Sequence, residues 1–314
     1  FCVDGWRLDV AADLGHSSEF NHKFWKDFRA NVKLANPEAV ILAEHYGDPS
    51  SWLQGDEWDT IMNYDAFMEP LTWFLTGMEK HSDSSNSALY GDGESFFRSM
   101  HYHMSRMQGQ SVMTAMNQLS NHDHSRFLTR TNQMVGRIGT MGAEMASVGV
   151  NYGVFREAVI VQMTWPGAPT IYYGDEAGLC GFTDPDNRRT YPWGREDYQM
   201  IDFHRVMIRI HKSYEVLKTG SLGFLWNDYQ GLCYARFSHD EQIIVIVNNR
   251  EESREVEIRL CQAGISRLED TRLERIIMTS AEGFTEEREE YTASAGILKI
   301  TMPAFGAVVL HHKN

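Results

Sequence analysis

Three short apolar segments, each followed by a carboxylate, constrain the fold of this chain most. They are GWRLDVA (5–11), VILAEHYG (40–47) and LSNHDHSRF (119–127), and they carry Asp9, Glu44 and Asp123. In a parallel α/β fold the carboxyl ends of the strands meet at one face, where the loops converge. The pattern therefore predicts an α/β fold that gathers three carboxylates in one site.

The segments alternate with stretches of helical spacing. Apolar periodicity predicts helices over 17–36, 94–108, 153–165 and 198–214, the first of them capped by a serine. Runs of β-forming residues predict strands over 3–11, 39–45, 60–64, 115–123 and 169–176. Residues 81–86 are expected in a surface loop. This alternation is typical of βαβ units with a parallel sheet.

The pattern changes after about residue 217. Strand-like runs such as GLCYARFS, QIIVIVNN, REVEIRL and ILKITMPAFGAVVLH are separated by turn residues. They predict an antiparallel β-sandwich. We therefore expect two domains, an α/β domain over 1–216 and a β-sandwich over 217–314.

Composition argues against several classes of function. The net charge of −14 argues against a nucleic-acid partner, because phosphate contacts need clustered Lys and Arg. No apolar run is long enough to cross a bilayer, so no membrane partner is expected. Cys2, Cys180, Cys233 and Cys261 form no C-x-x-C pair, which favours free thiols and a cytoplasmic location.

Paired carboxylates indicate a definite chemistry. Cleavage of a glycosidic bond requires two of them, one as acid/base and one as nucleophile. A third can stabilise the positive charge that develops on the sugar ring. A single Asp or Glu after a strand is more often a helix cap or a surface charge. The interpretation therefore depends on all three together.

The sequence around these carboxylates resembles that of the α-amylase family, glycoside hydrolase family 13. Three conserved regions of that family are similar to 5–11, 43–46 and 120–123, and a fourth similarity lies in TIYYGDEAGLCGFTDPDNRRTYPW (170–193). GDEWDTIMNY (55–64) and DPDNRRTYPW (184–193) most resemble the neopullulanase, cyclomaltodextrinase, maltogenic amylase and amylopullulanase branches.

The resemblance begins at the fourth strand of the family's TIM (β/α)8 barrel. It implies a partial barrel, strands four to eight, over 1–216, with the family's usual β-sandwich after it. We expect the N-terminal half of the barrel to be missing from this chain, which would leave two strand edges open. The chain alone is then expected to self-associate, for example as a homo-oligomer, and to be inactive.

The resemblance implies a role for each candidate residue. Asp9 is expected to be the nucleophile, Glu44 the general acid/base, and Asp123 the third carboxylate, which binds sugar hydroxyls. Arg7 lies two residues before Asp9, so its side chain points to the same side and would keep Asp9 ionised. His122 is expected to hydrogen-bond the same sugar.

Other positions bear on the choice of substrate. Asp184 and Arg188 resemble a pair that contacts the sugar on the non-reducing side, although a salt-bridged loop explains them equally well. His45 stands where many relatives have Trp, and Ala12-Asp13 where cyclomaltodextrinases read Asn-Glu. These departures fall on the acceptor side, so they leave the exact substrate open.

Aromatic and metal-binding residues give weaker signals. Candidates to stack on sugar faces are Tyr64, Trp73, Tyr172 and Trp193, although aromatics in such a fold are more often core residues. His101 and His103 share one predicted helix, and no metal site is predicted. Calcium is common in the family, and its ligands are expected mainly in the missing part.

The resemblance thus implies a retaining hydrolase of α-1,4-linked glucans, with α-1,6 linkages left open, whose partner is an α-glucan. Two alternatives stay open. One is a transglycosylase with the same residues, because water and a sugar acceptor compete for one intermediate. The other is a catalytically silent fragment or interaction protein of the same fold.

Overall fold

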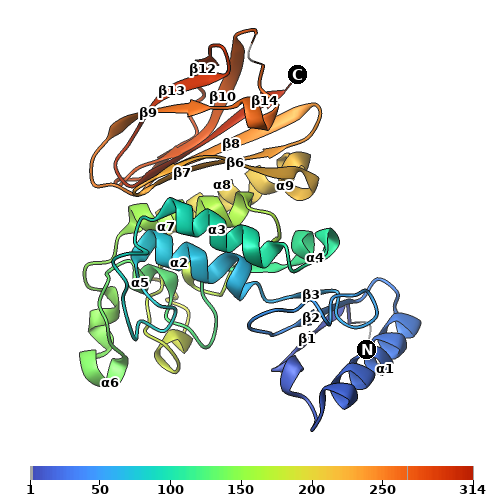
Figure 1. Cartoon of the computed structure of the whole chain (residues 1–314). Coiled ribbons are helices and arrows are strands. Elements are labelled where there is room, and N and C mark those ends of the chain that lie inside the picture. The colour runs from blue at the N-terminus through green and yellow to red at the C-terminus, as the bar shows by residue number, and fades with distance from the viewer. Residues whose placement is uncertain (1–2, 267, 314) are drawn as a thin grey trace. The chain divides into compact units, whose positions relative to one another are not determined.

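The computed structural model describes residues 3–266 and 268–313. These residues form two compact units (Figure 1). The first contains the chain up to Met68 together with Arg98–Gln118 and Gly167–Thr170, and the second contains Glu69–Phe97, Leu119–Pro166 and the chain from Ile171 onward. The division into domains 1–216 and 217–314 rests on the change of strand pattern and stays a prediction.

The first unit is built on parallel strands in chain order. β1 (Gly5–Leu8), β2 (Val40–Ala43) and β3 (Thr60–Ile61) form one parallel sheet, and β4 (Met116–Gln118) pairs in parallel with β5 (Ala168–Thr170). A parallel bridge from Met62 to Met116 lies between the two groups. Gly5 is needed at the start of β1, because a Cβ there would lie 2.5 Å from the Val40 carbonyl oxygen.

Helix α1 (Ser18–Ala35) covers this sheet (Figure 1). It begins as predicted, since the Ser17 side chain accepts a hydrogen bond from the Phe20 amide. Trp25 is 6% exposed and packs with Leu8 of β1 and Ile41 of β2. The apolar stripe expected on this helix is only partly buried, because Phe20 is 52% exposed.

Three strands are shorter than predicted. The segments 60–64, 115–123 and 169–176 contribute only the two or three residues of β3, β4 and β5. The apolar residues beyond β3 are buried in helices instead, in the π-helical turn η2 (Tyr64–Met68) and in α2 (Glu69–Thr76), which the sequence did not predict. A buried apolar run alone does not distinguish a strand from a helix.

The remaining helices fall mostly in the second unit. The longest are α7 (Tyr152–Thr164) and α8 (Tyr198–Ser213), both as predicted, and α3 (Gly93–Met104), which contributes residues to both units. Short helices are α4 (Gly109–Thr114), α5 (Phe127–Arg130), α6 (Ile138–Met141) and α9 (Glu215–Thr219). Single helical turns are η1 (Ala11–Asp13), η3 (Ala143–Ser147), η4 (Asp175–Ala177), η5 (Asp186–Arg188) and η6 (Cys261–Ala263). Within the described ranges, no helix is both long enough and apolar enough to span a bilayer.

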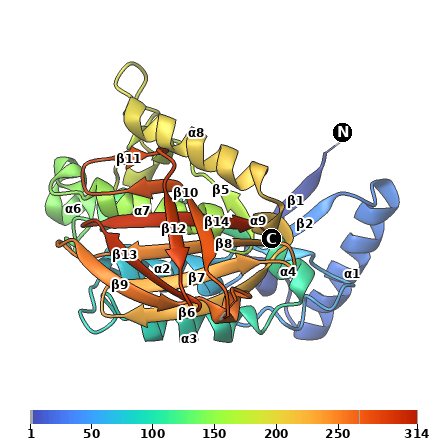
Figure 2. The same cartoon turned by 90° about the horizontal axis from the view of Figure 1, so that it is seen from above.

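The C-terminal region is antiparallel, which confirms that part of the prediction (Figure 2). The large sheet has the order β11-β10-β14-β8-β7-β6, and β12 pairs with β10. Its strands are β6 (Ser221–Asp228), β7 (Gly231–Phe237), β8 (Glu241–Asn248), β10 (Thr271–Thr279), β11 (Phe284–Thr285), β12 (Glu290–Ala293) and β14 (Gly306–Lys313). A second sheet pairs β9 (Arg254–Arg259) with β13 (Ile297–Met302).

Side-chain patterns explain how these two sheets pack. β9 and β13 alternate buried and exposed residues, so each has one face on the core and one in water. Ile258 and Leu298 of this pair share a core with Ile244 and Ile246 of the large sheet. β8 is buried on both faces, which explains its continuous apolar run, and α7 packs against the neighbouring β14 (Figure 1).

His204 makes the stability of the second unit depend on pH. It is 2% exposed on α8, and its Nδ1 lies 2.9 Å from the Met200 carbonyl oxygen. Burial lowers the pKa of His204 from the usual 6.5 to about 4, so the fold holds the neutral ring. The unfolded chain takes up a proton near pH 6.5, and the folded chain does so only near pH 4. Stability from this group is therefore full above pH 6.5 and is lost as the pH falls toward 4.

We predict that the protonation of His204 alone lowers the free energy of unfolding by about 2 kcal/mol between pH 7 and pH 5. Urea unfolding at the two pH values measures it. His204→Gln should reduce the pH dependence by that amount, whereas His16→Gln, at an exposed position, should leave it unchanged. An unaltered pH dependence in His204→Gln would contradict the assignment.

Candidate active site

The parallel pairing of β1 and β2 brings Asp9 and Glu44 to the same edge of the first unit. Leu8 pairs with Ala43, and each carboxylate follows its strand by one residue. The Arg7 guanidinium contacts both carboxylates, with Nη1 2.5 Å from Asp9 Oδ1 and Nη2 3.1 Å from Glu44 Oε2. The structure therefore places these three predicted residues together.

The two carboxylates differ in exposure. The Asp9 side chain is 76% exposed, whereas that of Glu44 is 10% exposed. Burial alone would lower the pKa of Arg7, but the hydrogen bond to Asp9 and the charge of Glu44 raise it overall. Arg7 is thus a permanent cation between the two groups. Asp9 is open to a ligand, and Glu44 faces this cation as well as its apolar neighbours.

The backbone after Asp9 is strained, and its conformation lets an amide donate a hydrogen bond to Glu44. Val10 has φ 42° and ψ 45°, a left-handed conformation that costs a β-branched residue about 1–3 kcal/mol. In this conformation the Val10 amide donates to Glu44 Oε2 at 3.1 Å. The backbone of Glu44 is held as well, since its amide donates to the Leu8 carbonyl oxygen at 2.8 Å. The carboxylate is thereby fixed from both strands.

Tyr64 holds the other oxygen of Glu44. Its hydroxyl lies 3.4 Å from Glu44 Oε1, and its ring stacks on Tyr46 at 4.2 Å between centroids. Burial raises the pKa of Tyr64 far above its usual value, so the hydroxyl keeps its proton. The side chain is fully buried, so Tyr64 acts on Glu44 and is not exposed for stacking on a sugar.

A cavity of about 240 Å³ opens beside Glu44. Its walls include Ala12, Asp13 and His45, the residues expected on the acceptor side. His45 Nε2 lies 3.3 Å from the Asp48 carbonyl oxygen, and its ring contacts that of Trp52 at 4.9 Å. Burial lowers the pKa of His45, which favours the neutral ring at neutral pH.

Asn21 of α1 fixes the wall of this cavity, and the sequence analysis missed it. Its Nδ2 donates to the carbonyl oxygens of Ala11, Ala12 and Leu14 at 3.0–3.1 Å. Its Oδ1 accepts from Trp52 Nε1 at 2.8 Å. A sequence signal was available, because this polar residue stands four positions before Trp25 and so lies on the apolar stripe of the helix. In the structure Asn21 is 2% exposed.

Four other predicted residues gather in the second unit. His122 Nε2 lies 3.3 Å from Asp123 Oδ2, and Arg188 Nη2 lies 3.6 Å from Asp123 Oδ1. Arg188 Nε is 2.6 Å from Asp184 Oδ1. These side chains are all between 37% and 48% exposed, so the group is open to solvent.

The backbone around Asp123 is held by residues that the sequence analysis did not identify. Asn187 Nδ2 donates to the carbonyl oxygens of Asn121 and His124 at 3.0 and 2.7 Å. Thr183 Oγ1 donates to the Asp123 carbonyl oxygen at 2.5 Å, and His81 Nδ1 lies 2.8 Å from that hydroxyl. The loop after α2 and the loop after β5 therefore hold the backbone of the segment that carries Asp123.

A buried cation supports the same loops. Arg126 is 0% exposed, donates to Asp175 Oδ1 at 2.9 Å and lies over the Tyr172 ring at 4.5 Å. Burial raises the pKa of Asp175, and Arg126 opposes this rise. Burial also raises the pKa of Tyr172 to about 12. Tyr172 is therefore part of this support, with a face already occupied by Arg126.

The predicted residues thus form two groups, Arg7–Asp9–Glu44 with His45, and His122–Asp123 with Asp184 and Arg188. They belong to different units. Their convergence on one cleft stays a prediction. Among the stacking candidates, Trp73 is half-buried on α2 and Trp193 is 77% exposed. No cluster of three or more His, Cys, Asp or Glu side chains within 3–266 and 268–313 fits a metal ion.

Comparison with known proteins agrees with the resemblance seen in the motifs. Residues 2–201 match the family described as the α-amylase catalytic domain. The match covers more than half of the 314 residues, and the chain therefore belongs to the α-amylase family. This also supports the predicted α/β fold of the segment that carries Asp9, Glu44 and Asp123.

Similar proteins include several glycoside hydrolases. Neopullulanase 2 of Thermoactinomyces vulgaris is 36% identical over 266 residues, which are 83% of this chain and 40% of that protein. A cyclomaltodextrinase of Thermoanaerobacter pseudethanolicus is 35% identical over 250 residues, 79% of this chain and 37% of that protein. The solved debranching enzyme of Nostoc punctiforme is 27% identical with a TM-score of 0.73, covering 98% of this chain and 58% of that one. The chain thus spans about two-fifths of the length of these curated relatives.

We predict that Asn21→Leu destabilises the first unit by roughly 2–3 kcal/mol, because the carbonyl oxygens of Ala12 and Leu14 and the Trp52 indole lose their partner. The Ala11 carbonyl oxygen keeps its hydrogen bond from Trp25 Nε1. Urea unfolding followed by tryptophan fluorescence measures the change. Asn31→Leu, at an exposed position on the same helix, is the matched control and should change stability by less than about 0.5 kcal/mol. Equal effects of the two substitutions would contradict the role of Asn21.

Proposed function

We propose that this protein is a retaining α-glucan hydrolase of the neopullulanase and cyclomaltodextrinase type. The observation that carries the proposal is the Arg7 guanidinium, which holds an exposed Asp9 and a shielded Glu44 at the ends of adjacent strands. A retaining mechanism needs a nucleophile and an acid/base about 5–5.5 Å apart. Two carboxylates on one guanidinium are compatible with that spacing.

In this proposal Asp9 attacks the anomeric carbon while Glu44 protonates the leaving oxygen. The bond between Asp9 Oδ and the anomeric carbon forms as the glycosidic bond breaks. Glu44, now ionised, accepts a proton from water, which displaces Asp9 and restores the original configuration. Arg7 and the Val10 amide stabilise the carboxylate of Glu44 at that stage.

The third carboxylate would act from the second unit. We propose that Asp123, supported by His122 and Arg188, binds sugar hydroxyls and favours the distorted ring. This requires β1–β5 to correspond to strands four to eight of a TIM barrel, whose loops converge at one face. Their parallel order along the chain supports that correspondence.

The substrate class comes from the names of the relatives. Neopullulanase and cyclomaltodextrinase indicate α-glucans such as pullulan and cyclodextrins, and we propose such a substrate for this protein. A cytoplasmic location and homo-oligomer formation remain proposals based on the sequence. The mechanism as proposed uses no cofactor.

Transglycosylation is the second candidate, and the cavity beside Glu44 favours it. Ala12, Asp13 and His45 line a space of about 240 Å³ next to the acid/base, where an acceptor sugar would compete with water. Products distinguish the two reactions. Maltotriose incubated at high concentration would yield longer oligosaccharides in a transglycosylase, and only glucose and maltose in a hydrolase.

We predict that Asp9→Asn abolishes turnover in the full-length gene product. Glu44→Gln should lower the rate on starch by roughly 10²–10⁴-fold. It should lower the rate far less on an α-glucosyl fluoride, whose leaving group needs no protonation. Asp56→Asn, at an exposed carboxylate on a nearby loop, is the control and should keep wild-type activity. Reducing-sugar and fluoride-release assays measure these rates. Equal losses on both substrates in Glu44→Gln would remove the support for its role as the acid.

A further inference from the structure

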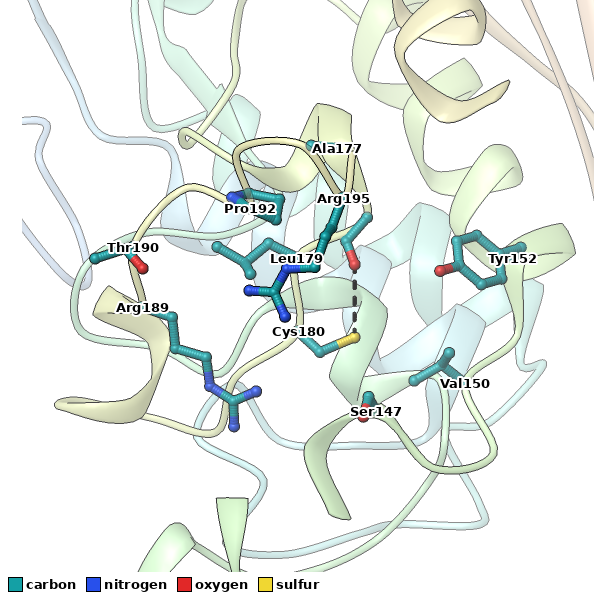
Figure 3. A pocket seen from close by; sticks show the side chains of 11 residues that line it. Ser147, Val150, Tyr152, Ala177, Leu179, Cys180, Arg189, Thr190, Pro192 and Arg195 are labelled. Carbon is teal, nitrogen blue, oxygen red and sulfur yellow. Dashed lines mark hydrogen bonds between the residues drawn. The ribbon is translucent and has the colours of Figure 1, made fainter. Parts of the chain in front are cut away.

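The cavity of about 680 Å³ in the second unit contains polar groups that pair with one another (Figure 3). The Cys180 thiol lies 3.9 Å from the Gly178 carbonyl oxygen. The Arg189 guanidinium donates to both carboxylate oxygens of Asp186, at 2.9 and 2.8 Å. These contacts are structural. A polar group without such a partner lies in the first unit, close to the proposed acid/base.

That group is the side chain of Gln118, the last residue of β4. Gln118 is 0% exposed. Neither its side-chain oxygen nor its nitrogen completes a hydrogen bond with any residue in the described ranges. Burying an unpaired amide costs stability, and an apolar side chain of similar size would avoid that cost. Packing alone therefore does not explain a glutamine at this position.

Strand register places Gln118 beside Tyr64. Met62 forms a parallel bridge with Met116, and Tyr64 and Gln118 each lie two residues further along the chain. The turn η2, which begins at Tyr64, packs against β4. The end of β4 and the start of η2 therefore meet where the Tyr64 side chain reaches Glu44.

A buried pair of asparagines fixes this register. Asn63 and Asn117, each one residue before the pair in question, are 1% and 0% exposed. Asn63 Nδ2 donates to Asn117 Oδ1 at 2.7 Å, and the Asn63 backbone amide donates to the Met116 carbonyl oxygen at 3.0 Å. Asn117 is also packed closely, since a Cβ at Gly167 would lie 2.5 Å from its Nδ2. The two segments are thus locked together.

Gln118 acts on the Tyr64 hydroxyl. Burial raises the pKa of Tyr64, and the neighbouring titratable groups Tyr46 and Glu44 add to that rise. The Gln118 amide has the opposite effect and lowers the pKa of Tyr64. A donor directed at the phenol oxygen acts in this way, because it stabilises the ionised form. The Gln118 N–H therefore faces the oxygen of the hydroxyl that lies 3.4 Å from Glu44 Oε1.

The two oxygens of Glu44 have different partners. Oε2 accepts from Arg7 Nη2 and from the Val10 amide, both at 3.1 Å. Oε1 faces the Tyr64 hydroxyl. Because two donors occupy Oε2, Oε1 is the oxygen that remains to carry the proton of an acid. Tyr64 orients that oxygen, and Gln118 lies against the far side of the same hydroxyl.

We propose that Gln118 is a positioning residue for the acid/base Glu44 and acts through the Tyr64 hydroxyl. The role of Glu44 rests on the proposed function. A donor on the phenol oxygen polarises the hydroxyl and strengthens the hydrogen bond that the hydroxyl gives to Glu44. Gln118 needs no contact with the substrate for this role. It should therefore affect bond cleavage rather than substrate binding.

Steady-state kinetics of the full-length protein tests this role. Gln118→Met keeps the length of the side chain and removes the amide. It should lower kcat on starch about threefold to tenfold and leave KM within about twofold. The fall of kcat/KM at high pH should move to higher pH, because a weaker hydrogen bond disfavours the ionised carboxylate. The value of kcat/KM for α-glucosyl fluoride, whose leaving group needs no acid, should stay unchanged.

A double-mutant cycle determines whether the effect passes through Tyr64. In a Tyr64→Phe background, Gln118→Met should cause no further loss, whereas independent effects would add. Gln242→Met is the matched control, because Gln242 is a buried glutamine on β8 whose side-chain oxygen lacks a partner among the described residues. This control should leave kcat and the pH profile unchanged.

The outcomes separate this inference from the proposed function. Unaltered kinetics in Gln118→Met, equal losses on starch and on the fluoride, or additive losses with Tyr64→Phe would overturn the role of Gln118. Thermal unfolding checks that the variant folds, and Gln118→Leu repeats the test with a smaller side chain. Absence of hydrolysis by the unsubstituted protein would refute the proposed function and this role together. Hydrolysis that Asp9→Asn abolishes and Gln118→Met leaves unaltered would refute the role of Gln118 alone.

Discussion

The candidate site depends on the parallel register of β1 and β2. Because Leu8 pairs with Ala43, the residues that follow these strands reach the same edge and meet one guanidinium. A shift of one residue in this pairing would turn Glu44 away from Arg7. The close approach of Gly5 to Val40 helps to fix the register at the other end of the strands.

Fixed backbone surrounds both groups of candidate residues. In the first unit the Val10 amide, the Tyr64 hydroxyl and the Asn21 side chain hold Glu44 and the adjoining loop. In the second unit Asn187 and Thr183 hold the segment that carries Asp123. Reactive side chains supported in this way need little reorganisation when a substrate binds, which is how preorganised sites lower barriers.

The sequence predicted the elements that have strong local signals. Ser17 begins α1 as expected, and the continuous apolar run of β8 is a strand buried on both faces. The lengths of β3, β4 and β5 were not predictable, because apolar residues after these strands bury equally well in a helical turn. The helix α2 was missed for the same reason.

The sequence could predict which residues form the candidate site. It could not predict the backbone conformation and long-range contacts that position them. The motifs identified Arg7, Asp9 and Glu44, whereas the left-handed Val10 has no signature in a sequence that lacks glycine there. Thr183 contacts Asp123 across 60 residues of chain, and His81 contacts Thr183 across 102, so only the fold reveals them. Long-range contacts of this kind leave no local pattern.

Covalent trapping tests the central claim most directly. The full-length protein would be incubated with 5-fluoro-α-D-glucosyl fluoride, digested with trypsin and analysed by mass spectrometry. A retaining mechanism with Asp9 as nucleophile predicts a glycosylated peptide Leu8–Lys23 whose fragments place the sugar on Asp9. A label on Glu44 or Asp123, or hydrolysis with inverted anomeric configuration, would contradict the account.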